Sequence, residues 1–130
     1  MWSWEVAAPP WLARVRGDIR RRVDATPGIP GSDSEAAERL LLAFEELTSN
    51  GLRHALPPVT ASITVGGTGW LLDVADGAVG QEPAEAVDRD PALGGLGLYL
   101  TAALSTVHGW CVAGDRKHVW ALLPFDRPAG

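Results

Sequence analysis

Apolar residues recur at helical spacing in two segments near the start of the chain. In the first segment they come every four residues and predict a helix from about residue 10 to 25: Trp11, Val15, Ile19 and Val23. In the second, a similar stripe predicts a helix from about 33 to 55: Ala36, Leu40, Phe44, Leu47 and Gly51. Ser32 and Glu35 have the spacing of a capping box at the start of this second helix, and Pro57 and Pro58 end it.

Alternation of apolar and polar residues predicts the strands. Residues 59–65 alternate cleanly, and the turn GGTG leads into a return strand, so a hairpin is expected over residues 59–75. A second hairpin is expected over residues 110–124, with its turn at Gly114-Asp115. The N-terminal stretch WSWEVAA is typical of a short strand.

Residues 77–93 have no periodicity, which indicates a loop, and a third helix is predicted to open on the glycines at 94 and 95 and to run to about residue 109. The predicted order is therefore strand, helix, helix, hairpin, loop, helix, hairpin. Three main helices on a mixed, mostly antiparallel sheet give an α+β fold, a two-layer sandwich. No repeat or boundary divides the chain, so residues 1–130 are expected to form one domain with a tail at 125–130.

Composition narrows the range of functions. Hydrophobic residues make up 46% of the chain and charged residues 21%, which indicates a globular protein. The net charge of −5 disfavours nucleic acid as a partner, and the arginines between 14 and 22 are interpreted as a solvated helix face. Cys111 is the single cysteine, so no disulfide or cysteine-based zinc site can form within the chain. No apolar run approaches the roughly 18 residues of a membrane span, and a cytoplasmic location is expected.

Four polar residues gather near the end of the second predicted helix. Glu46 and Asn50 are four residues apart and share a helix face, and Arg53 and His54 follow on the same stripe. Carboxylate and amide oxygens suit a hard cation such as Mg²⁺, a carboxylate near the ion could deprotonate an attacking hydroxyl or water, and an arginine one turn on could meet a phosphate. Taken alone, the same residues are more typical of an exposed helix end.

Two further motifs follow. In Asp76-Gly77-Ala78-Val79-Gly80, a carboxylate at the end of a strand is followed by small residues that let a ligand approach the backbone. That carboxylate could accept hydrogen bonds from an exocyclic amine such as that of adenine, although a plain Asp-Gly turn explains it as well. Gly94-Gly95-Leu96-Gly97-Leu98 opens a helix, where backbone N–H groups and the helix dipole favour phosphate, but a glycine loop formed for packing is the alternative.

The order of these three motifs resembles the Bergerat-fold (GHKL) ATPases, which include histidine-kinase catalytic domains, DNA gyrase, mismatch-repair ATPases and the anti-sigma-factor serine kinases. Residues 46–54 are similar to the family's N box, residues 76–80 to its G1 box, and residues 95–98 to its G2 box. Residues 117–124 are similar to its last strand. The resemblance covers the chain from about residue 3 to 124.

The resemblance implies a role for each matching residue. Asn50 would ligate Mg²⁺ between the ATP phosphates, Glu46 would be the general base, Arg53 would face a phosphate, and Asp76 would read the adenine amine. The remaining residues implied to contact the nucleotide are Ala78, Gly80, Gly95, Leu96, Gly97 and Leu98. Residues 81–93 would form a short ATP lid, and Ala78 departs from the family because a glycine stands at this place in the G1 box.

The chain is most similar to the compact anti-sigma-factor serine kinases, which implies a cytoplasmic regulator of bacterial transcription that binds Mg-ATP. The implied partner is a sigma factor, which it would sequester, or an anti-sigma antagonist, which it would phosphorylate on serine. A homodimer through the N-terminal strand is also expected, since an exposed apolar edge invites pairing. Two alternatives stay open: a non-catalytic, nucleotide-dependent protein-binding module, and a separate catalytic domain of a histidine-kinase-like system.

Overall fold

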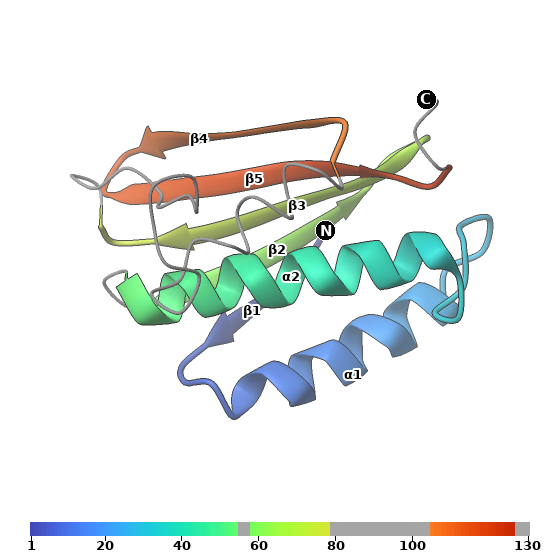
Figure 1. The fold of residues 1–130 in the computed structure, drawn as a ribbon, viewed down its shortest axis with the longest axis horizontal. Helices are drawn as coiled ribbons and strands as arrows, with labels where there is room; N and C mark the ends of the chain where they lie inside the picture. Colours follow the sequence, from blue (N-terminus) through green and yellow to red (C-terminus); the bar gives the residue numbers. More distant parts are fainter. Residues whose placement is uncertain (55–57, 79–104, 127–130) are drawn as a thin grey trace, which may run out of the picture.

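The computed structural model describes residues 1–54, 58–78 and 105–126, and Figure 1 shows how their helices and strands are arranged. In chain order these residues form β1 (Trp2–Val6), α1 (Trp11–Asp24), α2 (Glu35–His54), β2 (Val59–Val65), β3 (Gly69–Asp76), β4 (Val107–Ala113) and β5 (Arg116–Pro124). The strands form one sheet, and both helices lie on the same side of it. The predicted α+β class with two layers is confirmed for this part of the chain.

The sheet has the strand order β1-β2-β3-β5-β4, and every neighbouring pair is antiparallel. The prediction of a mixed sheet is therefore wrong for the described strands. The chain enters the edge strand β4 first and then folds back through Gly114, whose φ of 64° suits a glycine. This return places β5 between β4 and β3. Both predicted hairpins are confirmed, although β4 begins at Val107 and not at residue 110.

The prediction of three main helices is not borne out, because the described residues contain two. The third predicted helix falls mostly on residues 94–104, which lie outside the described ranges. Its expected end was wrong, since residues 107–109 belong to β4, where they pair with β5. Neither of the two described helices is long and apolar enough to cross a bilayer.

The hydrophobic core fills the space between the helices and the sheet. On β2 the apolar residues Val59, Ala61 and Ile63 are buried toward the helices, and their polar neighbours point away. The apolar stripe predicted for α2 is buried along its whole length. At the start of β3, the fully buried ring of Trp70 meets Phe125 edge to face, with ring centroids 4.7 Å apart. The core thus holds α2 firmly against the central strands.

The first turn of each helix differs in detail from the prediction, although α1 begins where it was expected, at Trp11. In α1, Trp11 was expected to be buried but is 41% exposed, and the neighbouring Leu12 is buried in its place. The guanidinium of Arg14 instead covers the Trp11 ring, 4.8 Å from its centroid. In α2, Ser34 is the capping residue, because its Oγ accepts a hydrogen bond from the Ala37 amide at 3.1 Å. The capping box predicted from Ser32 is therefore wrong, since the Ser32 hydroxyl donates to Asp24 at 2.6 Å.

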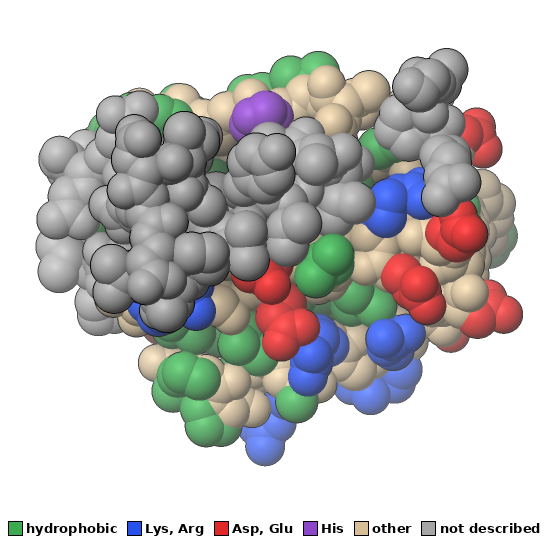
Figure 2. Space-filling view, viewed as in Figure 1, with side chains coloured by type: hydrophobic (Ala, Val, Ile, Leu, Met, Phe, Trp, Pro, Cys, Tyr) green, Lys and Arg blue, Asp and Glu red, His purple; other side chains and the backbone are tan. Residues whose placement is uncertain are grey.

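Charged side chains of both signs lie on part of the helical face of the molecule, as Figure 2 shows. The arginines of α1 belong to this solvated face, as predicted, and several are paired with acids. Arg16 donates to Glu45 of α2 at 2.7 Å, which joins the two helices, and both side chains are more than a third exposed. An exposed pair of this kind contributes little to stability. Its consequence for the site is that Glu45 is directed toward α1.

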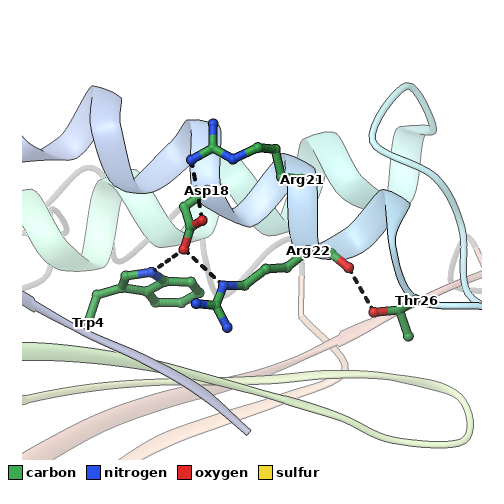
Figure 3. A network of polar contacts seen from close by, with 5 residues as sticks. All are labelled: Trp4, Asp18, Arg21, Arg22 and Thr26. Carbon is green, nitrogen blue, oxygen red and sulfur yellow. Dashed lines mark hydrogen bonds and ion pairs between the residues drawn. The ribbon is translucent and has the colours of Figure 1, made fainter.

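Asp18 fastens α1 to the edge strand β1, as Figure 3 shows. Its carboxylate accepts a hydrogen bond from the Trp4 indole N–H at 2.7 Å, one from Arg22 at 2.9 Å and one from Arg21 at 3.3 Å. These donors, Trp4 foremost, hold the pKa of the Asp18 carboxyl below its ordinary value of 3.8. The ionised carboxylate therefore links the first strand to the first helix.

Asp18→Asn is expected to lower the free energy of unfolding at neutral pH by about 1–2 kcal/mol, because charged hydrogen bonds are lost at a partly solvated position. Since the pKa of Asp18 is lowered by folding, its contribution is present above pH 3.8 and is lost as the pH falls through the lowered pKa. Urea unfolding of both proteins at neutral and strongly acid pH should show the difference disappear in acid. Asp115→Asn, at the exposed β4–β5 turn, is the matched control. A difference that persists unchanged in acid would exclude this role.

Candidate functional site

The end of α2 meets the end of β3 at one end of the two-layer structure, toward the left in Figure 1. Gly51 lies at this contact, because a Cβ at this position would be in ordinary van der Waals contact, 3.4 Å from Val59 Cγ1 and 3.9 Å from Val74 Cγ1. Val74 comes two residues before Asp76, and alternate residues of a strand point to the same face. The Asp76 side chain therefore lies on the helix-facing side of the sheet, just beyond the point where α2 touches it.

Asn50 stands next to this contact and is almost wholly buried, with 9% of its surface exposed. Its Oδ1 atom is buried and has no hydrogen-bond partner among residues 1–54, 58–78 and 105–126. A buried acceptor without a partner costs free energy, so native proteins keep few of them, and those they keep often serve a function. The oxygen predicted to hold a cation is thus available for one.

Glu46 lies one turn before Asn50 on the same helical face, and it is partly exposed. Among the described residues it forms no hydrogen bond or ion pair, whereas the adjacent Glu45 is bound to Arg16. Of the two neighbouring carboxylates, Glu46 is therefore the one free to act beside Asn50. Arg53, one turn after Asn50, is exposed, which leaves its guanidinium accessible to an anion.

Asp76 is the second wall of the candidate site and is 2% exposed. Its Oδ1 accepts a hydrogen bond from the Ala78 amide at 2.7 Å, which closes a tight turn at the end of β3. Ala78 itself is buried, and the described residues with positive φ are Gly28 and Gly114. An alanine therefore stands at this place in the G1-like motif without backbone strain.

Lys117 was not predicted as a site residue, yet it is the partner of Asp76. The two residues face each other in the β3–β5 register, and the Lys117 Nζ atom lies 3.6 Å from Asp76 Oδ2. Lys117 is 6% exposed, which is rare for a lysine that is not paired. The sequence pattern of β5 could have indicated that Lys117 is buried, since Lys117 shares a strand face with the buried residues Ala121 and Leu123.

Several predicted residues lie outside the described part of the chain. These are Gly80, Gly95, Leu96, Gly97, Leu98 and the predicted lid at 81–93. The described candidate residues stand on two elements that pack together through Gly51 and Val74. On α2 they are Glu46, Asn50 and Arg53, and at the end of β3 Asp76 contacts Ala78 and Lys117. A cavity of about 270 Å³ is found elsewhere, at the opposite end of β3 and β5, where Gly69, Thr106 and Pro124 are among its lining residues.

The arrangement separates two kinds of chemistry. On α2, an amide oxygen and a carboxylate with free lone pairs can meet a hard cation and a phosphate, and an arginine lies one turn away. Across from them, the buried Asp76 carboxylate can accept a hydrogen bond from an uncharged amine. A ligand that carries phosphates at one end and an amine-bearing ring at the other would match both walls.

Comparisons with known proteins bear on the family and the fold. The family model for the histidine kinase-like ATPase domain matches residues 8–121. The chain is similar in structure to the histidine kinase AdeS of Acinetobacter baumannii, with a TM-score of 0.53 and 15% sequence identity over 98% of this chain and 69% of that one. It is also similar to the histidine kinase domain of the EL346 blue-light activated histidine kinase of Erythrobacter litoralis, with a TM-score of 0.52 and 21% identity over 95% and 68% of the two chains. No curated protein is matched by its sequence.

Proposed function

Because the chain belongs to the histidine kinase-like ATPase domain family, whose members bind ATP, we propose that it is a Mg-ATP-binding regulatory protein of the anti-sigma-factor serine kinase type. One observation carries the proposal. The Asn50 Oδ1 atom is buried on the helix face that also presents Glu46, and within the described part of the chain it has no hydrogen-bond partner. Such an oxygen fits a ligand of Mg²⁺, and no other described group satisfies it.

In this proposal each end of the nucleotide has its own residues. Asn50 holds the metal ion, Glu46 accepts the proton of the attacking hydroxyl, and Arg53 faces a phosphate. A Mg²⁺ ion held by Asn50 would supply neutralisation of the phosphate charge. Asp76 accepts a hydrogen bond from the adenine amine, and the backbone after it approaches the base. The proposed nucleotide contacts are completed by Ala78, Gly80, Gly95, Leu96, Gly97 and Leu98, with residues 81–93 as lid.

The regulatory part of the proposal concerns a protein partner, either a sigma factor or an anti-sigma antagonist that receives phosphate on a serine. A cytoplasmic location goes with this role. The proposal includes a homodimer through β1, because β1 is the terminal strand of the sheet and an edge strand can pair with a second copy. Light scattering that finds only monomers at high concentration would exclude the dimer.

Calorimetry with Mg-ATP tests the proposal directly. We expect the wild-type chain to bind Mg-ATP, and removal of Mg²⁺ with a chelator to weaken the binding by about tenfold or more, because the cation that Asn50 would hold no longer offsets the phosphate charge. Mg²⁺ titrated without nucleotide serves as the control, since a single amide oxygen holds the ion weakly. Absence of Mg-ATP binding would overturn the proposed function, and binding that ignores Mg²⁺ would overturn the role of Asn50.

A further inference from the structure

Lys117 and Asp76 form a buried pair of opposite charges at the end of the sheet. Their side chains are 7% and 3% exposed, and they lie on the helix-facing side, in register on neighbouring strands. Burying two charges costs solvation free energy, which their mutual attraction offsets only in part. A pair retained at the end of β3, two residues beyond Val74, which lies against Gly51 of α2, therefore invites a functional explanation.

The distance within the pair is longer than that of a direct hydrogen bond. The Lys117 Nζ and Asp76 Oδ2 atoms are 3.6 Å apart, whereas charged N–H···O bonds are about 2.7–2.9 Å long. Asp76 Oδ1 is already bound to the Ala78 amide. Oδ2 thus keeps capacity to accept a hydrogen bond, and the ammonium beside it keeps capacity to donate one. The two groups present an acceptor and a donor side by side.

Such a pair matches the edges of both purines. Adenine carries an amine donor at position 6 beside the acceptor N1, whereas guanine carries the acceptor O6 beside the donor N1–H. A carboxylate alone accepts a hydrogen bond from the adenine amine and repels the O6 atom of guanine. With an ammonium next to it, the carboxylate can accept from N1–H of guanine while the ammonium donates to O6.

We propose that Lys117 is a base-discriminating residue, which donates a hydrogen bond to the purine edge beside the atom that Asp76 reads, so that the site takes 6-oxopurine nucleotides such as GTP as well as ATP. This proposal rests on the proposed function, because it assigns the base end of the same nucleotide site. In this proposal Lys117 contacts the base directly, in addition to balancing the charge of Asp76. Guanine requires the Lys117 donor, because its O6 atom carries no hydrogen that Asp76 could accept. For adenine the donor only adds to the hydrogen bond that Asp76 already makes.

The test is calorimetry of wild type and Lys117→Met with Mg-ATP and Mg-GTP. We expect the wild type to bind GTP within about tenfold of ATP. In Lys117→Met the affinity for GTP should fall by about tenfold to a hundredfold more than the affinity for ATP, because the oxopurine loses its donor and meets an unpaired carboxylate. Arg116→Met is the matched control, since it removes a cation from the adjacent strand position, whose side chain is bound to the Ala75 carbonyl.

Lys117→Met leaves a buried carboxylate unpaired and can unfold the protein, so circular dichroism of each variant is compared with that of the wild type. Lys117→Gln provides a neutral donor and should retain more GTP affinity than Lys117→Met. Equal losses for both nucleotides in the variants would reduce Lys117 to a counter-charge and overturn the proposal. Wild-type binding of ATP with GTP weaker by more than about a hundredfold would also overturn it. Binding of neither nucleotide by the wild type would instead overturn the proposed function.

Discussion

Glu46→Gln is expected to slow the cleavage of ATP by about 10²- to 10⁴-fold while the affinity for Mg-ATP changes little. Glutamine keeps the size and polarity of the side chain but cannot take a proton. Glu46 is free of partners among the described residues, so the substitution breaks no contact of the fold. The measurement is the rate of ADP formation under saturating Mg-ATP, together with calorimetric binding of the same preparation.

Glu45→Gln is the control for this prediction, because it neutralises the adjacent carboxylate on the same helix. Glu45 is bound to Arg16 and faces α1, so its loss should leave the rate of ADP formation unchanged. If both variants lose activity equally, Glu46 has no specific role as a base. If the wild type binds Mg-ATP but forms no ADP, with or without its partner, the chain is a nucleotide-dependent binding module, which is the alternative that the sequence left open.

Asn50→Ala is expected to weaken Mg-ATP binding by about tenfold to a hundredfold. The nucleotide-free protein should keep its stability within about 1 kcal/mol, because the Oδ1 atom has no hydrogen bond to lose. Calorimetry gives the affinity, and urea unfolding without nucleotide gives the stability. Weakened Mg-ATP binding with retained stability is characteristic of a ligand-binding residue. Replacing a purely structural asparagine would lower the stability and leave the affinity unchanged.

Ser49→Ala is the matched control, as it alters the adjacent, partly exposed position of α2 and should change neither quantity. Unchanged Mg-ATP affinity in Asn50→Ala would remove the metal site from α2. A large loss of stability with no loss of affinity would show that Asn50 supports the fold and that its oxygen finds a partner in solution.

Local patterns in the sequence were enough to predict the α2 wall of the site. Residues four apart on a helix share a face, so Glu46 and Asn50 could be brought together from their spacing alone. The hairpins were predictable for a similar reason, because their strands are neighbours along the chain and their turns contain glycine. The fold class followed from the order of these elements.

The opposite wall could not be predicted in full. Asp76 and Lys117 meet because β5, and not β4, pairs with β3, and because the register sets these two positions opposite each other. Strand order and register over a long separation depend on the whole core, and no local pattern records them. The capping residue of α2 was predicted wrongly for a different reason. Ser32 and Ser34 are both good capping residues, and the choice depended on Asp24, which bonds to Ser32.

The pairing of β3 with β5 has a consequence for how the chain folds. β1 to β3 with α1 and α2 come from the first part of the sequence, whereas β5 joins β3 across a long separation along the chain. Long-range strand pairs require the largest loss of loop entropy and tend to form late. Asp76 and Lys117 therefore come together only when the sheet is complete. A nucleotide bound at this point would favour the finished fold by mass action, and its presence in the cell would help determine how much of the chain stays folded.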